Sequence, residues 1–226
     1  MARIGIEWYN DYHKTANKLK SSERSAVGFG HTLSGTKVYE RQGGEEKENS
    51  TQKELGAELG LNKQKTTVID ILYSVGHGNK HGLLKNTSSQ KPTNDQETDE
   101  TTQVETTSMK WWIVDAGEIL QSEGIFERWG NADFFGRLHY ILGFHSVCSE
   151  SDDRGQRFAR HLENGENMRW AWIRACAETE SGNVSCAYLR AENQASDTLN
   201  DHWIGKGHVS PDPVCPSILI HLRTTL

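Results

Sequence analysis

The sequence TVIDILYSV at residues 67–75, followed by Gly76-His77-Gly78, gives the strongest indication of the fold. This run is β-branched and mostly apolar, which favours a strand buried on both faces. Two similar runs follow it along the chain, KWWIVDA at residues 110–116 and LHYILGF at residues 138–144. Continuously apolar strands are typical of a parallel sheet that helices cover on both sides.

The regions around these strands predict further strands and helices. Alternating apolar residues indicate a first strand over residues 3–9, and residues 11–27 are expected to form a polar helix. We interpret the polar residues 34–56 as a surface loop that runs into a short helix. Two later strands are expected at residues 184–190 and 217–222.

Two amphipathic helices are predicted after the third apolar strand. The first begins near Ser151 or Asp152 and ends at Gly165. The second begins near Asn167 and ends before Gly182. The second helix has an apolar stripe with helical spacing, formed by Met168, Ala171, Trp172, Ala175 and Cys176.

Strands and helices therefore alternate, which predicts an α/β fold: a three-layer α/β/α sandwich with a mostly parallel central sheet. A chain of 226 residues suits one domain over residues 1–226. Residues 86–108 contain seven threonines and five acidic residues but one Lys and one Val. Such a segment buries too little surface to offset its ordering entropy, so we predict a disordered polar insertion there.

Composition excludes several classes of function. The net charge is −6, from 25 basic and 31 acidic residues, and no Lys/Arg cluster offers phosphate contacts, so nucleic acid is not an expected partner. The mean hydropathy is −0.71, and no apolar run reaches the ~18 residues of a membrane span. The start of the chain, Met1-Ala2-Arg3-Ile4-Gly5, has no apolar signal segment, so we expect a cytoplasmic protein.

The four cysteines do not indicate a metal site. Cys148, Cys176, Cys186 and Cys215 include no CxxC pair, so no structural zinc, and no cofactor of any kind, is predicted. Cys176 lies in the apolar helix stripe and Cys186 in an apolar strand, which indicates buried core thiols. Cys215 is interpreted as a loop residue.

Three loops are expected at the carboxyl ends of the apolar strands, where α/β folds bind ligands. They are residues 76–79, 115–118 and 143–148. Glycines on both sides of His77 would let the backbone turn sharply and approach a ligand. The Gly78 amide could face a developing oxyanion, and the His77 imidazole could act as a base. A tight turn with a surface histidine is the alternative.

These segments resemble the caspase/gingipain-like (clan CD) superfamily of cysteine peptidases. One apolar strand ends in His77-Gly78 and a second ends in Asp115-Ala116-Gly117, and the segment from Phe135 to Phe144 with the two helices after it also looks like that superfamily. The resemblance covers residues 66–180 and is closest to an uncharacterised bacterial and archaeal branch. The strand Ile4–Trp8 and the sequence VSPDP at residues 209–213 also look like that branch.

The resemblance implies a Cys/His dyad, in which a thiolate attacks a peptide carbonyl and His77 transfers a proton to the leaving amine. It places the nucleophile at position 117, but the residue there is Gly117, which has no side chain. It also implies a peptide or protein as the ligand.

Three functions are compatible with this departure from the pattern. The first is a catalytically inactive pseudo-peptidase that acts as a binding or regulatory module. The second is an active peptidase that pairs His77 with a displaced nucleophile, Cys148. The third is a non-peptidase enzyme in which His77 or His145, with Asp115 or Glu118, activates water or a substrate proton. Two further explanations of Gly117 are that the fold is a different one, or that a cysteine at position 117 was changed to glycine by engineering.

Overall fold

The structure is a computed structural model. It describes residues 2–9, 19, 21–33, 37–43, 69–80, 82–83, 109–129, 137–193, 196–213 and 218–226. Within these ranges no helix has the length and apolar character needed to cross a bilayer. The expected insertion at residues 86–108 and the loop cysteine Cys215 lie outside the described residues.

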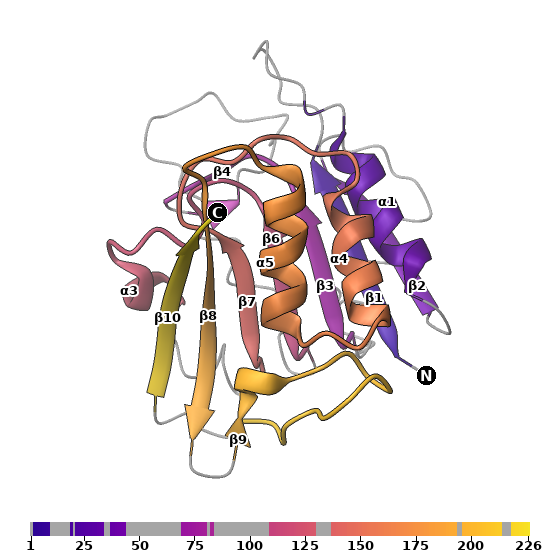
Figure 1. The fold of residues 1–226 in the computed structure, drawn as a ribbon, viewed down its shortest axis with the longest axis vertical. Coiled ribbons are helices and arrows are strands. Elements are labelled where there is room, and N and C mark those ends of the chain that lie inside the picture. Colours follow the sequence, from indigo (N-terminus) through magenta and orange to yellow (C-terminus); the bar gives the residue numbers. More distant parts are fainter. Residues whose placement is uncertain are drawn as a thin grey trace.

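One large mixed sheet forms the centre of the molecule (Figure 1). Its strand order is β10-β8-β7-β6-β3-β1-β2, with β9 paired to β8. Five neighbouring strands, β2, β1, β3, β6 and β7, run parallel to one another. The strand β8 is antiparallel to its two neighbours, β7 and β10. The main strands are β1 (Arg3–Tyr9), β2 (Lys37–Gly43), β3 (Ile71–Val75), β6 (Trp111–Asp115), β7 (Tyr140–Phe144), β8 (Ser185–Asn193) and β10 (Ile218–Thr225). The short elements are β4 (Gly78–Asn79), β5 (Gly82–Leu83), β9 (Ser196–Asp197) and the 3₁₀ turn η2 (Thr198–Asn200).

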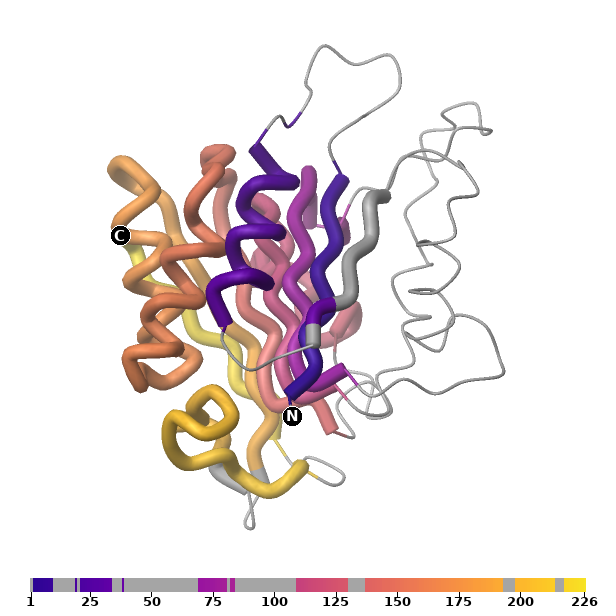
Figure 2. Tube along the Cα trace, turned by 90° about the vertical axis from the view of Figure 1, so that its right-hand side faces the viewer, coloured from indigo at the N-terminus to yellow at the C-terminus, as the bar shows by residue number. Residues whose placement is uncertain are grey.

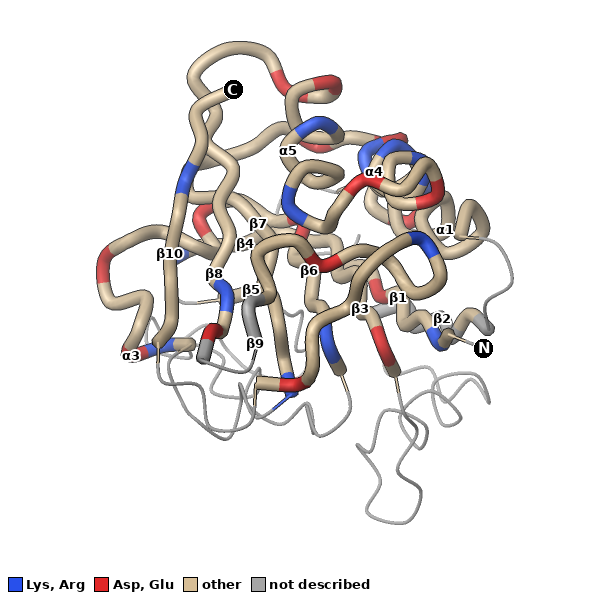
Figure 3. The backbone as a smooth tube through the Cα atoms, turned by 60° about the horizontal axis from the view of Figure 1, so that its bottom comes forward, with Lys and Arg blue, Asp and Glu red and all other residues tan. Residues whose placement is uncertain are grey.

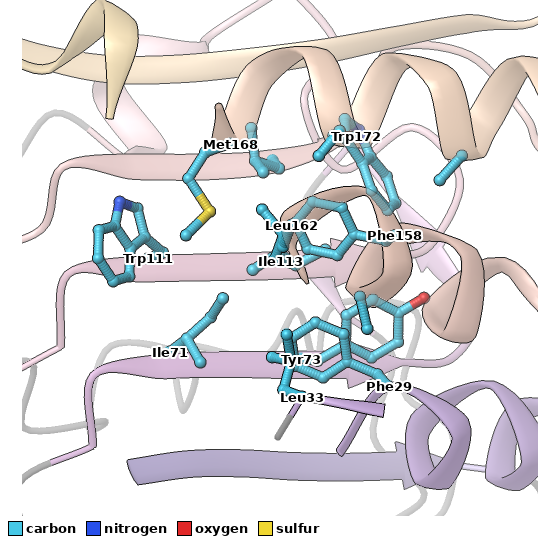
Figure 4. Packing of buried hydrophobic residues seen from close by; sticks show 14 of the residues in the cluster. Phe29, Leu33, Ile71, Tyr73, Trp111, Ile113, Phe158, Leu162, Met168 and Trp172 are labelled. Atoms are coloured by element: carbon cyan, nitrogen blue, oxygen red, sulfur yellow. The ribbon is translucent and has the colours of Figure 1, made fainter. Parts of the chain in front are cut away.

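Three helices cover one face of this sheet: α1 (Ser22–Thr32), α4 (Arg154–Glu163) and α5 (Met168–Thr179). Figure 2 shows them together on one side of the strands. Their apolar faces meet the sheet in a core rich in aromatic rings, in which Phe29 stacks on Tyr73 at 4.6 Å and on Phe158 at 5.6 Å between ring centroids (Figure 4). On the opposite face, α3 (Ile125–Trp129) and the turns before it pack against Trp112 and other buried residues. The predicted α/β fold with a mostly parallel central sheet is therefore confirmed.

The local predictions differ from the structure in two places. Residues 37–43, expected in a surface loop, form the edge strand β2 beside β1. The polar run KVYERQG carries no apolar alternation, because an edge strand buries little of its surface. The helix α1 spans Ser22–Thr32, so it extends beyond the end of the helix expected over residues 11–27, of which residues 11–18 and 20 lie outside the described part of the chain.

A buried polar cluster holds the loop that contains Asp201 and Asp212 at the amino-terminal ends of the central strands. The ring nitrogens of His139 contact carboxylates of Asp201 and Asp212, the latter at 3.2 Å. Lys110 donates to Asp212, and Arg137 donates to the same carboxylate at 2.7 Å. His139 and Asp201 are fully buried, so the loop that carries the two aspartates is held against the starts of β6 and β7.

Candidate functional site

A pocket of about 250 Å³ lies where the three predicted loops meet. The loops follow β3, β6 and β7, which are neighbours in the sheet, so their carboxyl ends open at the same edge. The N-terminal part of α4 closes one side of the pocket. The lining residues are Leu19, Val75, Gly76, His77, Gly78, Asp115, Gly117, Glu118, Val147, Cys148, Ser149, Glu150, Ser151 and Arg154.

Strand register brings His77 and Gly117 together. Val75 and Asp115 are the last paired residues of β3 and β6, and His77 and Gly117 each follow their strand's last residue by two positions. Both residues line the pocket. Two turns that are far apart in sequence therefore stand side by side, because parallel strands end at a common edge.

The two turns are in direct contact through their glycines. A Cβ atom on Gly78 would overlap the carbonyl oxygen of Gly117 and would lie 2.9 Å from the Cβ of Ala116. Any residue larger than glycine at position 78 would force the turns apart. The glycine after His77 is thus required for close packing, in addition to the turn conformation that the sequence predicted.

The loop after β7 packs against the other side of Gly117. A Cβ atom at position 117 would lie 3.3 Å from both the backbone nitrogen of Cys148 and the Cα of Val147. Glu118 has a positive φ of 61°, and its backbone N–H donates to the Ser146 carbonyl at 3.0 Å. Cys148 therefore lies in the same pocket as His77 and next to the place where a side chain at position 117 would begin.

A buried ion pair forms the floor of this site. Asp115, which is 4% exposed, binds the guanidinium of Arg154, which is 1% exposed. The Tyr73 hydroxyl donates to the other oxygen of Asp115 at 2.8 Å and lies 3.1 Å from the Ser25 hydroxyl. Burial by itself would lower the pKa of Arg154, but the Asp115 carboxylate raises it above its ordinary value. Both oxygens of Asp115 thus have buried partners, Arg154 on one and Tyr73 on the other.

Arg154 also fixes the loop that carries Cys148. Its guanidinium pairs with Glu180 and donates to the Ser149 carbonyl at 3.0 Å. Glu180 in turn accepts from the Ser149 amide at 3.0 and 3.1 Å. The Ser149 peptide groups are therefore held on both sides by a buried, charged pair. The sequence analysis missed Arg154 and Glu180, because both are of residue types usually solvated and Glu180 lies beyond the second helix in sequence.

The surroundings of Cys148 favour the neutral thiol over the thiolate. Burial raises its pKa, and the nearby Asp115 carboxylate raises it further, which together outweigh the effect of Arg154. A cysteine nucleophile reacts as the thiolate, which requires a lowered pKa. The environment of Cys148 is the opposite of the one that this chemistry needs.

The remaining candidate residues separate into two locations. Glu118 lines the pocket, whereas His145 is not among the lining residues. The His145 Nε2 lies 3.0 Å from the Ser122 hydroxyl and 3.3 Å from the Arg223 guanidinium. Cys176 and Cys186 are buried in the core. Over the described ranges, no group of three or more His, Cys, Asp or Glu side chains is arranged to hold a metal ion.

Comparisons with solved structures find distant similarity to C11 cysteine proteases. A secreted C11 cysteine protease from Bacteroides thetaiotaomicron, solved with an irreversible peptide inhibitor, aligns with a TM-score of 0.46 and 10% identity over 84% of this chain. An inactive zymogen C11 protease from Parabacteroides distasonis aligns with a TM-score of 0.48 and 12% identity over 83% of this chain. The alignments cover 66% and 61% of those two protease chains, less than two thirds of each.

Comparisons by sequence give a family without an assigned activity. No curated protein matches the chain. One family profile, described as "Domain of unknown function (DUF6345)", matches residues 6–225, almost the whole length. The chain therefore belongs to the DUF6345 family.

Proposed function

We propose that this chain is a caspase/gingipain-like pseudo-peptidase, which binds a peptide segment of another protein in its pocket without cleaving it. The observation that supports this most is the glycine at position 117, adjacent to the His77 turn. Position 117, next to the histidine turn, has no side chain, and burial raises the pKa of Cys148, the single thiol among the described residues that line the pocket.

The pocket retains features suited to an extended peptide. It combines backbone amides of two glycine turns with an apolar rim, where Val147 is 67% exposed. Ligand pockets commonly combine apolar walls with a few polar groups that orient the ligand, and this pocket has both. Binding of a protein segment would not require the covalent step that Gly117 prevents.

The second candidate is a cysteine peptidase that uses Cys148. It is favoured by one observation: Cys148 and His77 line the same pocket, and the Cys148 backbone lies 3.3 Å from the position of a Cβ at residue 117. For this chemistry to occur, a base such as His77 would have to take the proton of the Cys148 thiol, whose pKa is raised by burial. The two candidates are separable by experiment.

The test compares cleavage and binding on one set of peptides. The wild-type protein is incubated under reducing conditions with a fluorogenic peptide library and with unfolded casein, and the same peptides are tested for binding by fluorescence anisotropy. The pseudo-peptidase predicts binding without turnover. It also predicts that Val147→Asp weakens binding, whereas Ile204→Asp, at an exposed apolar position away from the pocket, does not.

Each candidate also has an outcome that contradicts it. Turnover by the wild type that disappears in both His77→Ala and Cys148→Ala would replace the pseudo-peptidase with the second candidate. A thiol-directed peptide inhibitor that leaves Cys148 unlabelled would exclude Cys148 as the nucleophile. Peptidase activity gained by Gly117→Cys would show that the rest of the catalytic arrangement is intact and that only the nucleophile is missing.

A further inference from the structure

A second pocket, of about 500 Å³, lies over the outer surface of α5. One wall is formed by Trp170, Ile173 and Ala177, which have helical spacing and lie outside the buried stripe of the helix. His202, in the loop after η2, forms part of the other wall. None of its lining residues lines the pocket that contains His77, which lies beyond the carboxyl end of α5 (Figure 1). The two pockets are therefore separate sites.

The two walls of the second pocket are fixed to each other. Asn167 and His202 form an antiparallel β-bridge between the start of α5 and the loop. The loop is closed by the His202 N–H, which donates to the His208 carbonyl at 2.8 Å. Lys206 in the same loop pairs with Glu163 on α4 at 2.7 Å. A ligand would therefore find the pocket already formed and would lose little free energy in ordering it.

Trp170 provides an apolar platform in this pocket. Its side chain is 48% exposed, although the indole has the largest apolar surface of any residue type. The Arg169 guanidinium lies 5.0 Å from the ring centroid and restrains the indole. The face of an aromatic ring carries partial negative charge, so it attracts the weakly positive C–H groups of a ligand. The platform is thus suited to a flat ligand that presents a row of C–H groups.

The polar groups of the pocket have unused hydrogen-bonding capacity. Within the described residues, Glu166 Oε2 and His202 Nδ1 are buried and have no hydrogen-bond partner. The other oxygen of Glu166 lies 3.0 Å from both His161 Nδ1 and the Arg174 guanidinium. A buried polar atom without a partner is unfavourable, and a ligand that provides the missing hydrogen bond relieves this cost. A hydroxyl can both donate and accept, so it can serve either atom.

The charges around the pocket disfavour a charged ligand. Figure 3 shows basic and acidic positions interspersed along α4 and α5, with neither sign dominant. Glu166 would repel an anion, and Arg169 and Arg174 on either side of Trp170 in sequence would repel a cation. A purely aliphatic ligand would leave Glu166 Oε2 and His202 Nδ1 without partners. The ligand that meets all these conditions is neutral, with C–H groups on one face and hydroxyls at its edge.

We propose that the pocket over α5 binds a neutral pyranose sugar, whose ring packs on Trp170 and whose hydroxyls bond to Glu166 and His202. A pyranose ring has the required apolar face and the required edge of hydroxyls. The sugar is either free or a unit of a glycan, and the chemistry of recognition is the same for both. Because the two pockets share no lining residue, this inference is independent of the proposed peptide binding.

The first test uses saturation-transfer NMR. The wild-type protein is mixed with millimolar methyl glycosides of glucose, galactose, mannose and N-acetylglucosamine. At least one should receive saturation, most strongly at the C–H groups of one ring face. Trp170→Ala should remove this transfer, whereas the matched variant Phe126→Ala, at a 50% exposed aromatic residue on α3, should leave it unchanged. Circular dichroism checks that both variants fold, and peptide binding measured by fluorescence anisotropy should be the same in Trp170→Ala and the wild type.

The second test examines the polar groups and the source of the sugar. Glu166→Gln should weaken binding of the preferred glycoside about tenfold, because a charged acceptor is lost. The uronic acid and the amino sugar that correspond to the preferred glycoside should bind more weakly than the neutral form. Affinity electrophoresis through gels that contain starch, galactomannan or xylan then separates the two sources. Retardation that depends on Trp170 assigns a glycan chain, and its absence assigns a free sugar.

Several results would overturn the proposal. One is the absence of saturation transfer to all four neutral glycosides. Another is transfer that persists unchanged in Trp170→Ala, which would place sugar binding on another surface. Stronger binding of the charged analogues would refute the neutral ligand. Peptide binding that is lost in Trp170→Ala, without any sugar binding, would instead assign this face of α5 to a protein partner.

Discussion

At the residue scale, Gly117 and Gly78 show how tightly the two turns of the site are packed. Gly117 requires no left-handed backbone, and a Cβ there would meet backbone atoms of Val147 and Cys148 at 3.3 Å. We expect Gly117→Ala to fold, with a loss of stability of about 1 kcal/mol as the loop shifts. Gly78→Ala should lose more, because its Cβ would overlap the Gly117 carbonyl.

Urea denaturation of the two alanine variants checks this order of stability. Gly182→Ala is not a suitable comparison, because Gly182 has a positive φ of 60° and would add backbone strain. The direct comparison of Gly78→Ala with Gly117→Ala is sufficient. A larger loss for Gly117→Ala would mean that the two turns are not in contact through Gly78.

The charged floor of the pocket gives a second prediction at this scale. Arg154→Leu would leave Asp115 and Glu180 without their cation, although both carboxylates are buried. Breaking a buried ion pair on one side destabilises a protein by about 3–5 kcal/mol. The matched control is Arg157→Leu on the same helix, since Arg157 pairs with Asp153 and Glu178 at the surface, where such pairs contribute about 0–1 kcal/mol. Equal losses measured by chemical denaturation would contradict the structural role of Arg154.

At the element scale, the middle of the sheet could be predicted from the sequence. The three apolar runs form β3, β6 and β7, and their pairing brings the predicted loops to one edge. The adjacency of His77 and Gly117 follows from that pairing. In contrast, β2 was missed because its polar sequence does not show the alternation of a half-buried strand. The contact of Arg154 with Asp115 was missed because it depends on how α4 crosses the sheet, which no local pattern records.

The packing of α4 on α1 gives a prediction for these two elements. A Cβ atom on Gly155 would overlap the Ser25 carbonyl and lie 3.1 Å from the Cβ of Phe29, so Gly155→Ala would push the helices apart. We expect a clear loss of stability, of about 1–3 kcal/mol. Gly28→Ala on α1 is the matched control: its Cβ would meet the Gln156 Cβ at 3.2 Å. There the gain in helix propensity, about 1 kcal/mol, offsets the tighter contact.

Thermal unfolding of the two helix variants distinguishes these effects. The melting temperature should fall in Gly155→Ala and remain close to that of the wild type in Gly28→Ala. A melting temperature that falls more in Gly28→Ala would show that the helices approach one another at a different point.

At the scale of the whole molecule, the cluster around Asp212 ties the C-terminal loop to the starts of the strands. Burial by itself would raise the pKa of Asp212, but hydrogen bonds from Lys110 and Arg137 outweigh it and lower the pKa to about 2. An aspartate whose pKa is lower in the folded state stabilises that state above its ordinary pKa of about 3.9. This stabilisation is lost as the pH falls from about 4 to about 2.

The loss of folding stability at acidic pH should therefore depend on Asp212. The free energy of unfolding, measured by urea denaturation from neutral pH downward, should decrease through this range in the wild type, in part because the Asp212 carboxylate takes up a proton. Asp212→Asn should be less stable than the wild type at neutral pH, because Lys110 and Arg137 lose their carboxylate partner. The difference between the two proteins should then shrink as the pH approaches 2. A difference that is constant with pH would show that the Asp212 charge does not hold the C-terminal loop, and that its contribution is one of packing alone.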